Sequence, residues 1–413
     1  MSSRSRSKST ALVATLAAAA LVATGCGSKG SGGGGGGGSD TITFGASLSL
    51  TGSLAREGQL TNEGYQLCQQ KVNAQGGIDV GGSKKKLKIK YQDDTSEPDT
   101  AAQLVDQFND DGIKLILSSY GSANTEAQAA VVERNGQVMA DSAGADDSIF
   151  QQGYTRTFAV LSPASDYAAS IIKAIHDLAK PQPKTIAFLS ADDGFSKTGA
   201  LGGMATAKKL GYQVVPAQYF PEGSTDVSSS LTKVKGTKPD VVIGTVHLEE
   251  GVAIVKQSHE LGVKPDGFGE TVAPPTPDFA KTLGKQAEGV LGSSQWSDTT
   301  KGSDKYFGTA KQYAADIKDE FGHVPDYHDA EASAACLAMV LAIEKAGSTD
   351  PDPVRDAMAK LDTESFFGHI KFNGKGQNVY KPMSVIQIQG GKVVTVWPKE
   401  GAEADLVWPG NKS

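Results

Sequence analysis

Apolar residues follow two different periods along most of this chain, and segments with the two periods alternate. The run that contains Ile42 and Phe44 is typical of a β-strand, because apolar and polar residues alternate there. Residues 56–75 instead carry apolar side chains every three or four positions, which predicts a helix that ends at Gly76 and Gly77.

The same alternation predicts a series of strands and helices. The predicted strands are 42–50, 87–91, 114–118, 137–141, 155–160, 185–190, 213–219, 240–246, 267–270, 290–296, 368–372, 384–389 and 392–397. The predicted helices are 56–75, 98–110, one from 124, 165–179, 196–210, 226–235, 249–261, 303–321, 330–346 and 351–361. Strands separated by helices indicate βαβ units with parallel sheets. About ten such units exceed one open sheet of ordinary size, so we predict an α/β fold with two lobes.

The last two strands have the pattern of a hairpin. Residues 384–389 and 392–397 alternate apolar and polar positions on either side of Gly390 and Gly391. Two glycines accept the positive φ angles of a primed turn, so we predict an antiparallel pair here.

The first 25 residues have the pattern of an export signal. Arg4, Arg6 and Lys8 precede an apolar run over residues 11–23, which is 13 residues long and interrupted only by Thr15. A helix needs about 20 apolar residues to cross a bilayer, so this run is too short for a membrane span. It favours a secretory signal peptide over residues 1–25.

The next segment indicates a lipid anchor and a tether. Residues 23–26, Ala-Thr-Gly-Cys, resemble a bacterial lipobox, in which Cys26 is acylated and becomes the mature N-terminus. An ordinary signal cleaved nearby, with Cys26 as an incidental thiol, is the alternative. Residues 26–40 are rich in Gly and Ser, which is typical of a flexible spacer. We therefore expect a lipid-anchored protein on the extracytoplasmic face of a bacterial membrane.

Composition and motifs exclude several classes of function. The chain has 47 acidic and 40 basic residues, a formal charge of −7, which argues against a nucleic-acid partner. Three Cys in 413 residues exclude a disulfide-rich scaffold, and no Cys-x-x-Cys pair indicates structural zinc. Gly-x-Ser-x-Gly, Walker-type and His-Glu-x-x-His motifs are absent from the sequence, so nothing favours a hydrolase or a cofactor.

An ordered set of short motifs resembles the type I periplasmic binding proteins, specifically the receptors for branched-chain amino acids and amides. The motifs are residues 45–52, 73–78, 91–94 with Pro98, 111–114, 119–123, 192–195 and 368–372. The resemblance implies two Rossmann-like lobes with parallel sheets, joined by a hinge of three crossovers.

The resemblance also implies where each lobe begins and ends. We expect crossovers near residues 160–162, 286–291 and 366–368. The expected limits are 41–160 with 297–365 for the first lobe, 161–296 with 366–398 for the second lobe, and 399–413 for a C-terminal tail.

The function implied by the resemblance is that of a solute-binding lipoprotein of an ABC importer, and not of an enzyme. Such a protein closes its lobes on an amino acid or a related small amide or carboxylate and delivers it to permease subunits. We expect a monomer without a cofactor. A ligand-sensing receptor lobe of the same fold is the alternative, and a secreted α/β hydrolase is less favoured.

Candidate ligand contacts in the first lobe follow two predicted strands. Ser122 matches the carboxylate-binding serine of the resembled receptors, and Ala123 follows it at an expected helix N-terminus. A plain helix N-cap is the alternative role for Ser122. Ala143, Gly144 and Ala145 follow the next strand, where the receptors carry small residues and a hydroxyl. Since Ala145 replaces the hydroxyl, we expect main-chain N–H groups to serve as donors there.

Four further candidates come from the same resemblance. Phe195 matches an aromatic residue that covers the ligand, and a core position is its alternative. Glu270 matches an acidic residue that pairs with the ligand ammonium, and a surface Glu is its alternative. His247 and Glu57 stand where the receptors usually place aromatic residues. These two polar replacements predict a ligand more polar than leucine, or one with a second cationic group.

The sequence also contains a candidate disulfide pair and a cluster of His and Asp residues. Under the resembled topology Cys68 and Cys336 fall in two helices of one lobe, and we expect a disulfide if their Cα atoms lie within about 7 Å; two buried free thiols are the alternative. His323, Asp326, His328 and Asp329 are close in sequence, but Pro325 and a helix start favour capping or surface roles, so we predict no metal.

Overall fold

The computed structural model describes residues 40–410. The expected signal peptide over 1–25, the acylation site at Cys26 and most of the 26–40 tether lie outside the described residues. In the part that is described, no helix is both long and apolar enough to cross a membrane.

The first sheet contains the strands β1 (Thr41–Leu48), β2 (Ile78–Val80), β3 (Ser83–Asp93), β4 (Leu115–Leu117), β5 (Val138–Asp141) and β6 (Thr157–Ala159). Their order is β2-β3-β1-β4-β5-β6, and every neighbouring pair is parallel except β2 with β3. The central strands β4 and β5 are buried along their whole length, as expected for parallel strands covered by helices on both faces.

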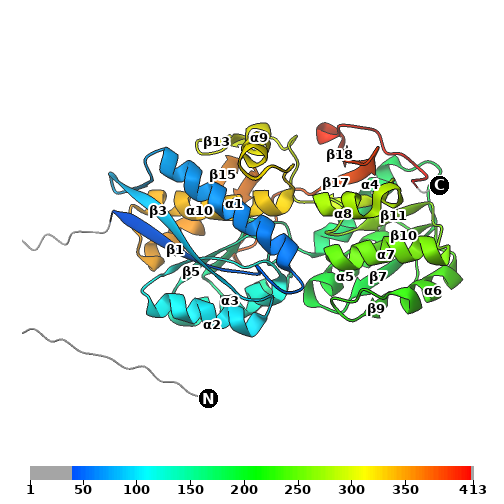
Figure 1. The fold of residues 1–413 in the computed structure, drawn as a ribbon, viewed down its shortest axis with the longest axis horizontal. Helices are drawn as coiled ribbons and strands as arrows, with labels where there is room; N and C mark the ends of the chain where they lie inside the picture. The colour runs from blue at the N-terminus through cyan, green and yellow to red at the C-terminus, as the bar shows by residue number, and fades with distance from the viewer. Residues whose placement is uncertain (1–39, 411–413) are drawn as a thin grey trace, which may run out of the picture. The chain divides into compact units, whose positions relative to one another are not determined.

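Helices cover both faces of this sheet. They are α1 (Ala55–Ala74), α2 (Pro98–Asp110), α3 (Ser122–Asn135), α9 (Ala310–Phe321), α10 (Tyr327–Ala346) and α11 (Pro351–Met358), with a short 3-10 turn η1 (Ile149–Gln151). Figure 1 shows α1 and α10 on one face and α2 and α3 on the other. We call this sheet with its helices lobe one.

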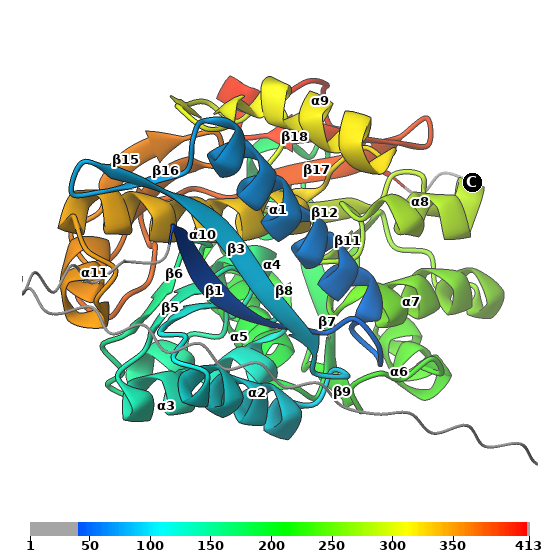
Figure 2. The same ribbon diagram turned by 60° about the vertical axis from the view of Figure 1, so that its left-hand side comes forward.

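The second sheet contains β7 (Thr185–Ala191), β8 (Gln213–Val214), β9 (Gln218–Phe220), β10 (Val241–Thr245), β11 (Gly267–Glu270), β12 (Leu291–Ser294), β17 (Ser384–Gln389) and β18 (Lys392–Trp397). The order is β18-β17-β12-β11-β10-β7-β8, and β9 also pairs with β7. The covering helices are α4 (Ser165–Leu178), α5 (Gly194–Lys209), α6 (Ser228–Thr237), α7 (Leu248–Leu261) and α8 (Pro277–Leu283), with η2 (Gly284–Ala287) and η3 (Lys399–Gly401) beside them. We call this part lobe two, and Figure 2 shows it from another side.

The α/β fold class predicted from the sequence is confirmed by these two parallel-rich sheets. The predicted C-terminal hairpin is also confirmed, because β17 and β18 are antiparallel and Gly390 and Gly391 have φ angles of +59° and +73°. The helix predicted over 303–321 is wrong at its start. Residues 303–309 hold a small hairpin, β13 (Ser303–Asp304) with β14 (Gly308–Thr309), and α9 begins only at Ala310.

Three chain segments connect the lobes, and their side chains bond to one another. The segments run from β6 to α4, from β12 to β13, and from β16 (Gly368–Lys371) to β17. The Ser162 hydroxyl donates to the carbonyl oxygen of Lys381 at 2.9 Å. Gln295 Oε1 accepts from the Ser162 N–H at 3.0 Å and from Lys381 Nζ at 3.1 Å. All three residues are buried, so the hinge is one hydrogen-bonded unit.

We propose that two crossovers lie later in the chain than the sequence indicated. Residues 286–291 hold the end of η2 and the start of β12, both in lobe two. The apolar run 366–372 has the pattern of a crossing strand, but β16 pairs with β15 (Asp362–Ser365) in a hairpin. Phe366 stacks on Tyr313 of lobe one with ring centroids 4.2 Å apart. We therefore propose that lobe two resumes near residue 381, and not at 366.

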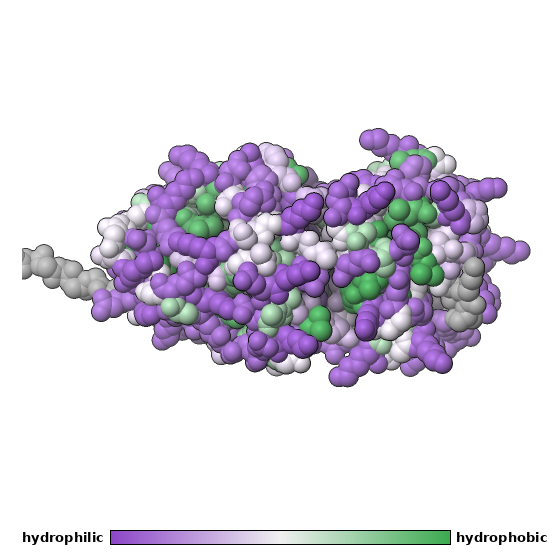
Figure 3. All heavy atoms as spheres, turned by 90° about the horizontal axis from the view of Figure 1, so that it is seen from above, coloured by the Kyte–Doolittle hydropathy of each residue, from purple (hydrophilic) through white to green (hydrophobic). Residues whose placement is uncertain are grey.

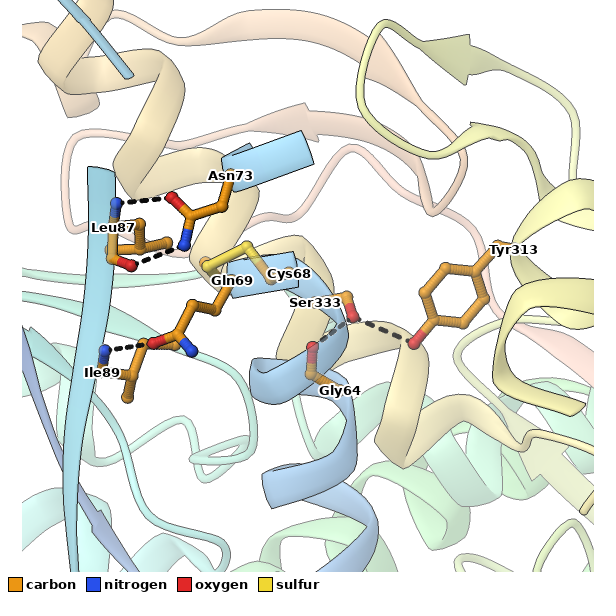
Figure 4. Close-up of a disulfide and its surroundings, with 9 residues drawn as sticks. Gly64, Cys68, Gln69, Asn73, Leu87, Ile89, Tyr313 and Ser333 are labelled. Atoms are coloured by element: carbon orange, nitrogen blue, oxygen red, sulfur yellow. Dashed lines mark hydrogen bonds between the residues drawn. A yellow bond between two sulfur atoms is a disulfide. The ribbon is translucent and has the colours of Figure 1, made fainter. Parts of the chain in front are cut away.

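A disulfide joins the two long helices of lobe one. Cys68 of α1 and Cys336 of α10 are bonded, with their Cα atoms 6.3 Å apart (Figure 4). The helices approach closely at Gly64, where a Cβ atom would lie 2.2 Å from the carbonyl oxygen of Asp329. The Ser333 hydroxyl donates to the Gly64 carbonyl at 2.6 Å beside this contact.

Replacing both Cys68 and Cys336 by Ala should lower the free energy of unfolding by about 2–5 kcal/mol, because the bond closes a long loop in the unfolded chain. Urea unfolding of the two proteins measures the loss. Reductant should lower the midpoint of the parent protein and leave that of the variant unchanged. Equal midpoints for the parent and the variant would contradict a stabilising role.

Candidate functional site

The two lobes touch through polar contacts that come from distant parts of the chain. Tyr120, which precedes α3 in lobe one, has its hydroxyl 3.1 Å from His247 Nδ1 at the start of α7 in lobe two. The Thr198 hydroxyl of α5 donates to Asp146 Oδ1 at 2.8 Å. Arg56 of α1 forms an ion pair with Asp278 of α8. The lobes are therefore in direct contact in this structure.

Between these contacts lies a small cavity, which we call the inner cavity. Its volume is about 10 Å³, roughly the space that one water molecule occupies. The residues that line it are Tyr120, Ser122, Ala143, Tyr167, Phe195, His247, Val272, Tyr327 and Glu331. Since they come from both lobes, any change in the distance between the lobes changes the size of this cavity.

A wider cavity of about 290 Å³ lies next to the inner one, and we call it the cleft mouth. Ser122 and His247 line both. The other residues of the cleft mouth are Ser53, Leu54, Ser96, Glu97, Pro98, Gly121, Ala123, Asn124, Asp193, Gly194, Glu222 and Gly223. The starts of α3 and α5 both border it, so the cleft mouth collects the N-termini of helices from each lobe.

Another cavity, of about 450 Å³, lies elsewhere. It is bordered by α8, α9 and the β17–β18 hairpin, and its lining includes Pro277, Trp296 and Val393 but no residue predicted for the site. Figure 3 views the molecule from above: most side chains on this face are hydrophilic, and hydrophobic ones gather over the half that holds lobe two.

The predicted site residues separate into three groups. Ser122, Ala143, Phe195 and His247 line the inner cavity. Ala123 is exposed and lines only the cleft mouth. The remaining ones, Gly144, Ala145, Glu57 and Glu270, line neither cavity.

Two of the main-chain donors expected after β5 are engaged within lobe one. The N–H groups of Ala143 and Gly144 both donate to Asp141 Oδ1, at 2.9 and 2.7 Å. Ala145 is buried, and its carbonyl oxygen accepts from the Ala164 N–H at 2.8 Å. In this geometry a buried carboxylate already uses the N–H groups of Ala143 and Gly144, and the expectation that main-chain N–H groups after β5 serve a ligand stays a prediction.

Glu270 ends β11 but faces α7. A Cβ atom at Gly251 of α7 would lie 2.6 Å from Glu270 Oε2, so the missing side chain makes room for the carboxyl group. Neither carboxyl oxygen has a hydrogen-bond partner among residues 40–410. Burial first, and the charge of Glu250 second, raise the pKa of Glu270 well above its usual value. Glu270 is therefore a buried carboxyl group under α7 that lines neither cavity.

Glu57 also has a structural partner. It is buried near the start of α1, and its Oε1 accepts from the Leu248 N–H at 3.3 Å. A carboxylate of lobe one thus lies at the N-terminus of α7 in lobe two, where the helix dipole favours a negative charge.

His247 carries positive charge more readily than an ordinary histidine. Burial alone would lower the pKa of its imidazole, but nearby carboxylates outweigh burial and raise that pKa. These carboxylates belong to Asp193, Glu250, Glu57 and Glu222. Oxygens of Asp193 and Glu222 also lie within 4.8 Å of the imidazole nitrogen, a spacing that would fit a metal ion.

Five cavity-lining residues were not predicted: Tyr120, Tyr167, Val272, Tyr327 and Glu331. Tyr327 and Glu331 are four residues apart on α10 and therefore share a face of that helix. A signal for Glu331 was present, because it interrupts a run of small apolar residues over 330–338. A charged residue within such a run has a partner or a function.

The sequence cluster around residues 323–329 has two separate roles. Asp326 caps α10, and Asp329 completes a capping box with it, so the capping interpretation is confirmed for these two residues. His323 Nε2 lies 2.5 Å from Glu63 Oε2 and 3.9 Å from Asp329 Oδ1. This arrangement is a charged contact between α1 and the loop before α10.

The chain is similar to proteins of known family and structure. A family model described as periplasmic binding protein matches residues 41–392. The Leu/Ile/Val-binding protein homolog 8 of Brucella abortus is 26% identical over 388 residues, covering 88% of this chain and 92% of the homolog. The leucine binding protein LivK of Thermotoga maritima has a TM-score of 0.76 at 21% identity, covering 86% of this chain and 97% of its own. LivJ of Streptococcus pneumoniae, solved with isoleucine, has a TM-score of 0.75 at 23% identity, covering 89% and 100%.

The His323–Glu63 contact should make stability depend on pH. The hydrogen bond to Glu63 and the charge of Asp329 raise the pKa of His323 from 6.5 to about 9. The charged imidazole therefore stabilises the fold fully below pH 6.5, and this stabilisation disappears as the pH rises through about 9. We expect His323→Gln to cost about 1–3 kcal/mol near pH 6 and almost nothing near pH 10.

Urea unfolding of both proteins at the two pH values measures this difference. Glu63→Gln is the matched variant, and it should remove most of the pH dependence of the His323→Gln effect. A cost that is the same at both pH values would show that the charge of His323 contributes nothing.

Proposed function

Since this chain belongs to the periplasmic binding protein family, as the sequence resemblance predicted, we propose that it is the solute-binding component of an ABC importer. The observation that carries this proposal is the inner cavity, whose lining comes from both lobes beside a three-segment hinge. The family and the similar solved proteins are binding proteins, and we propose binding without catalysis.

The proposed ligand is an amino acid or a related small amide or carboxylate. The relatives named above are described as Leu/Ile/Val-binding or leucine-binding proteins. Ser122 is the first residue of α3, where free N–H groups and the helix dipole favour an anion. Its Oγ accepts from the Asp146 N–H at 3.1 Å, and its own proton stays available for donation. We propose that the carboxylate of the ligand binds there.

Closure of the lobes is the proposed mechanism. The inner cavity holds about one water molecule, so an amino acid can enter only if the lobes separate. A ligand that touches both lobes then favours the closed form through its higher affinity for that form. The Tyr120–His247 and Glu57–Leu248 contacts would form again at closure.

Location and partners follow from the sequence expectations. We propose that Cys26 carries a lipid, that residues 26–40 tether the lobes to the extracytoplasmic face of the membrane, and that a monomer passes its ligand to ABC permease subunits. An acidic chain with this anchor would depend on the lipid for membrane attachment.

Ser122→Ala and Phe195→Ala should each weaken ligand binding by about 10- to 100-fold, through loss of a hydrogen bond to a charged group and loss of the aromatic cover. Mass spectrometry of solute carried through purification identifies the ligand, and calorimetry measures its affinity. Leu201→Ala is the matched control, because Leu201 lies on α5 with Phe195 but is 60% exposed. Unchanged affinity in both test variants, or chemical turnover of the solute, would contradict the proposal.

Cys26→Ala should abolish incorporation of labelled fatty acid and move the protein from the membrane fraction to the soluble fraction. Expression in a bacterial host with a lipoprotein pathway, followed by fractionation, measures both effects. A variant that stays labelled and membrane-bound would show that another feature holds the protein at the membrane.

A further inference from the structure

Glu331 is a buried carboxylate that borders the inner cavity. It lies on α10 between Ala330 and Ala332, and its side chain is almost completely buried, with 1% of the residue exposed. Among residues 40–410, its Oε2 has no hydrogen-bond partner. A buried carboxylate without a partner is costly, so this oxygen needs either a proton or a ligand group.

Lys381 compensates the charge of Glu331 only in part. Lys381 attracts Glu331 electrostatically, yet the hydrogen bonds of its Nζ go to the carbonyl oxygen and Oε1 of Gln295 in the hinge. Burial lowers the pKa of Lys381 to about 7, so this lysine is only partly charged at neutral pH. Burial, with the charges of Asp326 and Asp141, raises the pKa of Glu331 well above its usual value. Lys381 therefore leaves room for a second cation beside Glu331.

Four aromatic side chains form half of the remaining wall. Tyr120, Tyr167, Phe195 and Tyr327 line the inner cavity with Glu331. Tyr167 and Phe195 meet edge to face, with ring centroids 5.1 Å apart. The faces of such rings carry partial negative charge and attract ammonium groups.

The charges around the two cavities also favour a cationic ligand. Neither the inner cavity nor the cleft mouth is lined by any Lys or Arg of the described chain. Four acidic residues line them, Glu97, Asp193, Glu222 and Glu331, against one basic side chain, His247, which lines both cavities and lies beside Asp193 and Glu222. A field of this sign favours a cation and opposes a second anion.

We propose that the inner cavity selects a ligand with a cationic amine remote from its carboxylate, held between Glu331 and the surrounding aromatic rings. This inference rests on the proposed function and names the substrate class: amino acids with a basic side chain. Ser122 and Glu331 line the same cavity, so a ligand that enters when the lobes separate can place its carboxylate at α3 and its amine at α10. With the ligand carboxylate at Ser122, the α-ammonium group lies beside it at α3, so a purely aliphatic side chain brings no cation to Glu331, which disfavours leucine.

Calorimetry with L-lysine and L-norleucine tests this inference, because lysine is norleucine with an added terminal ammonium group. We expect lysine to bind the full chain at least tenfold more tightly than norleucine. Norleucine that binds as tightly as lysine would overturn the inference and leave the proposed function intact, since a solute would still bind. Failure of both to bind would also overturn it, and the solute that co-purifies would then test the proposed function alone.

Glu331→Gln keeps the shape of the side chain and removes its charge. We expect lysine affinity to fall at least tenfold and norleucine affinity to change less than twofold. The matched control is Glu344→Gln, because Glu344 lies on the same helix, pairs with Lys305 and lines neither cavity; its lysine-to-norleucine ratio should equal that of the parent. A folded Glu331→Gln protein with the parental ratio would overturn the inference. If this variant does not fold, the comparison of the two ligands on the parent protein decides.

Discussion

The hydrogen bonds among Ser162, Gln295 and Lys381 hold together the three segments through which the lobes are connected. Each segment connects two sheets, so its backbone N–H and C=O groups lie outside the strand-to-strand hydrogen bonds of either sheet. Buried polar groups need partners, and these three side chains provide them for one another. We propose that the lobes move by bending about this unit, so that the inner cavity, which both lobes line, opens or shuts with it.

The parts of the fold that sequence predicted are those set by local period and turn chemistry. The strand and helix alternation follows from side-chain periodicity, and Gly390 with Gly391 specified the last turn because both need positive φ. The crossovers were less predictable. Residues 366–372 are as apolar as a crossing strand, and only tertiary packing decides between a crossing and a hairpin. Phe366 packs against Tyr313 of lobe one, and that contact between distant segments is invisible in local pattern.

Some residues of the candidate site could be predicted from local sequence pattern, and others could not. Ser122, Phe195 and His247 each follow a parallel strand, and the carboxyl ends of such strands converge in any fold of this class, so their meeting could be predicted. Tyr327 and Glu331 reach the cavity from α10, which comes much later in the chain and packs on lobe one through α1. Glu270 was expected at the ligand, but it lines neither cavity. It ends the right strand, but Gly251 leaves space on the far side for its carboxyl group, and side-chain direction at a strand end depends on such space.

Buried carboxylates near the cleft are stabilised in different ways. The difference distinguishes carboxylates with a structural role from one that is proposed to bind a ligand. Asp141 accepts two main-chain N–H groups and the Ser118 hydroxyl, although burial still raises its pKa to about 6. Glu57 lies at the start of α7 and accepts the Leu248 N–H, so its charge also ties the lobes together. Glu270 is fully buried and lines neither cavity, and burial raises its pKa well above the usual value. Glu331 has an oxygen without a partner and borders a cavity, so it is the carboxylate in this series whose compensation can come from outside the chain.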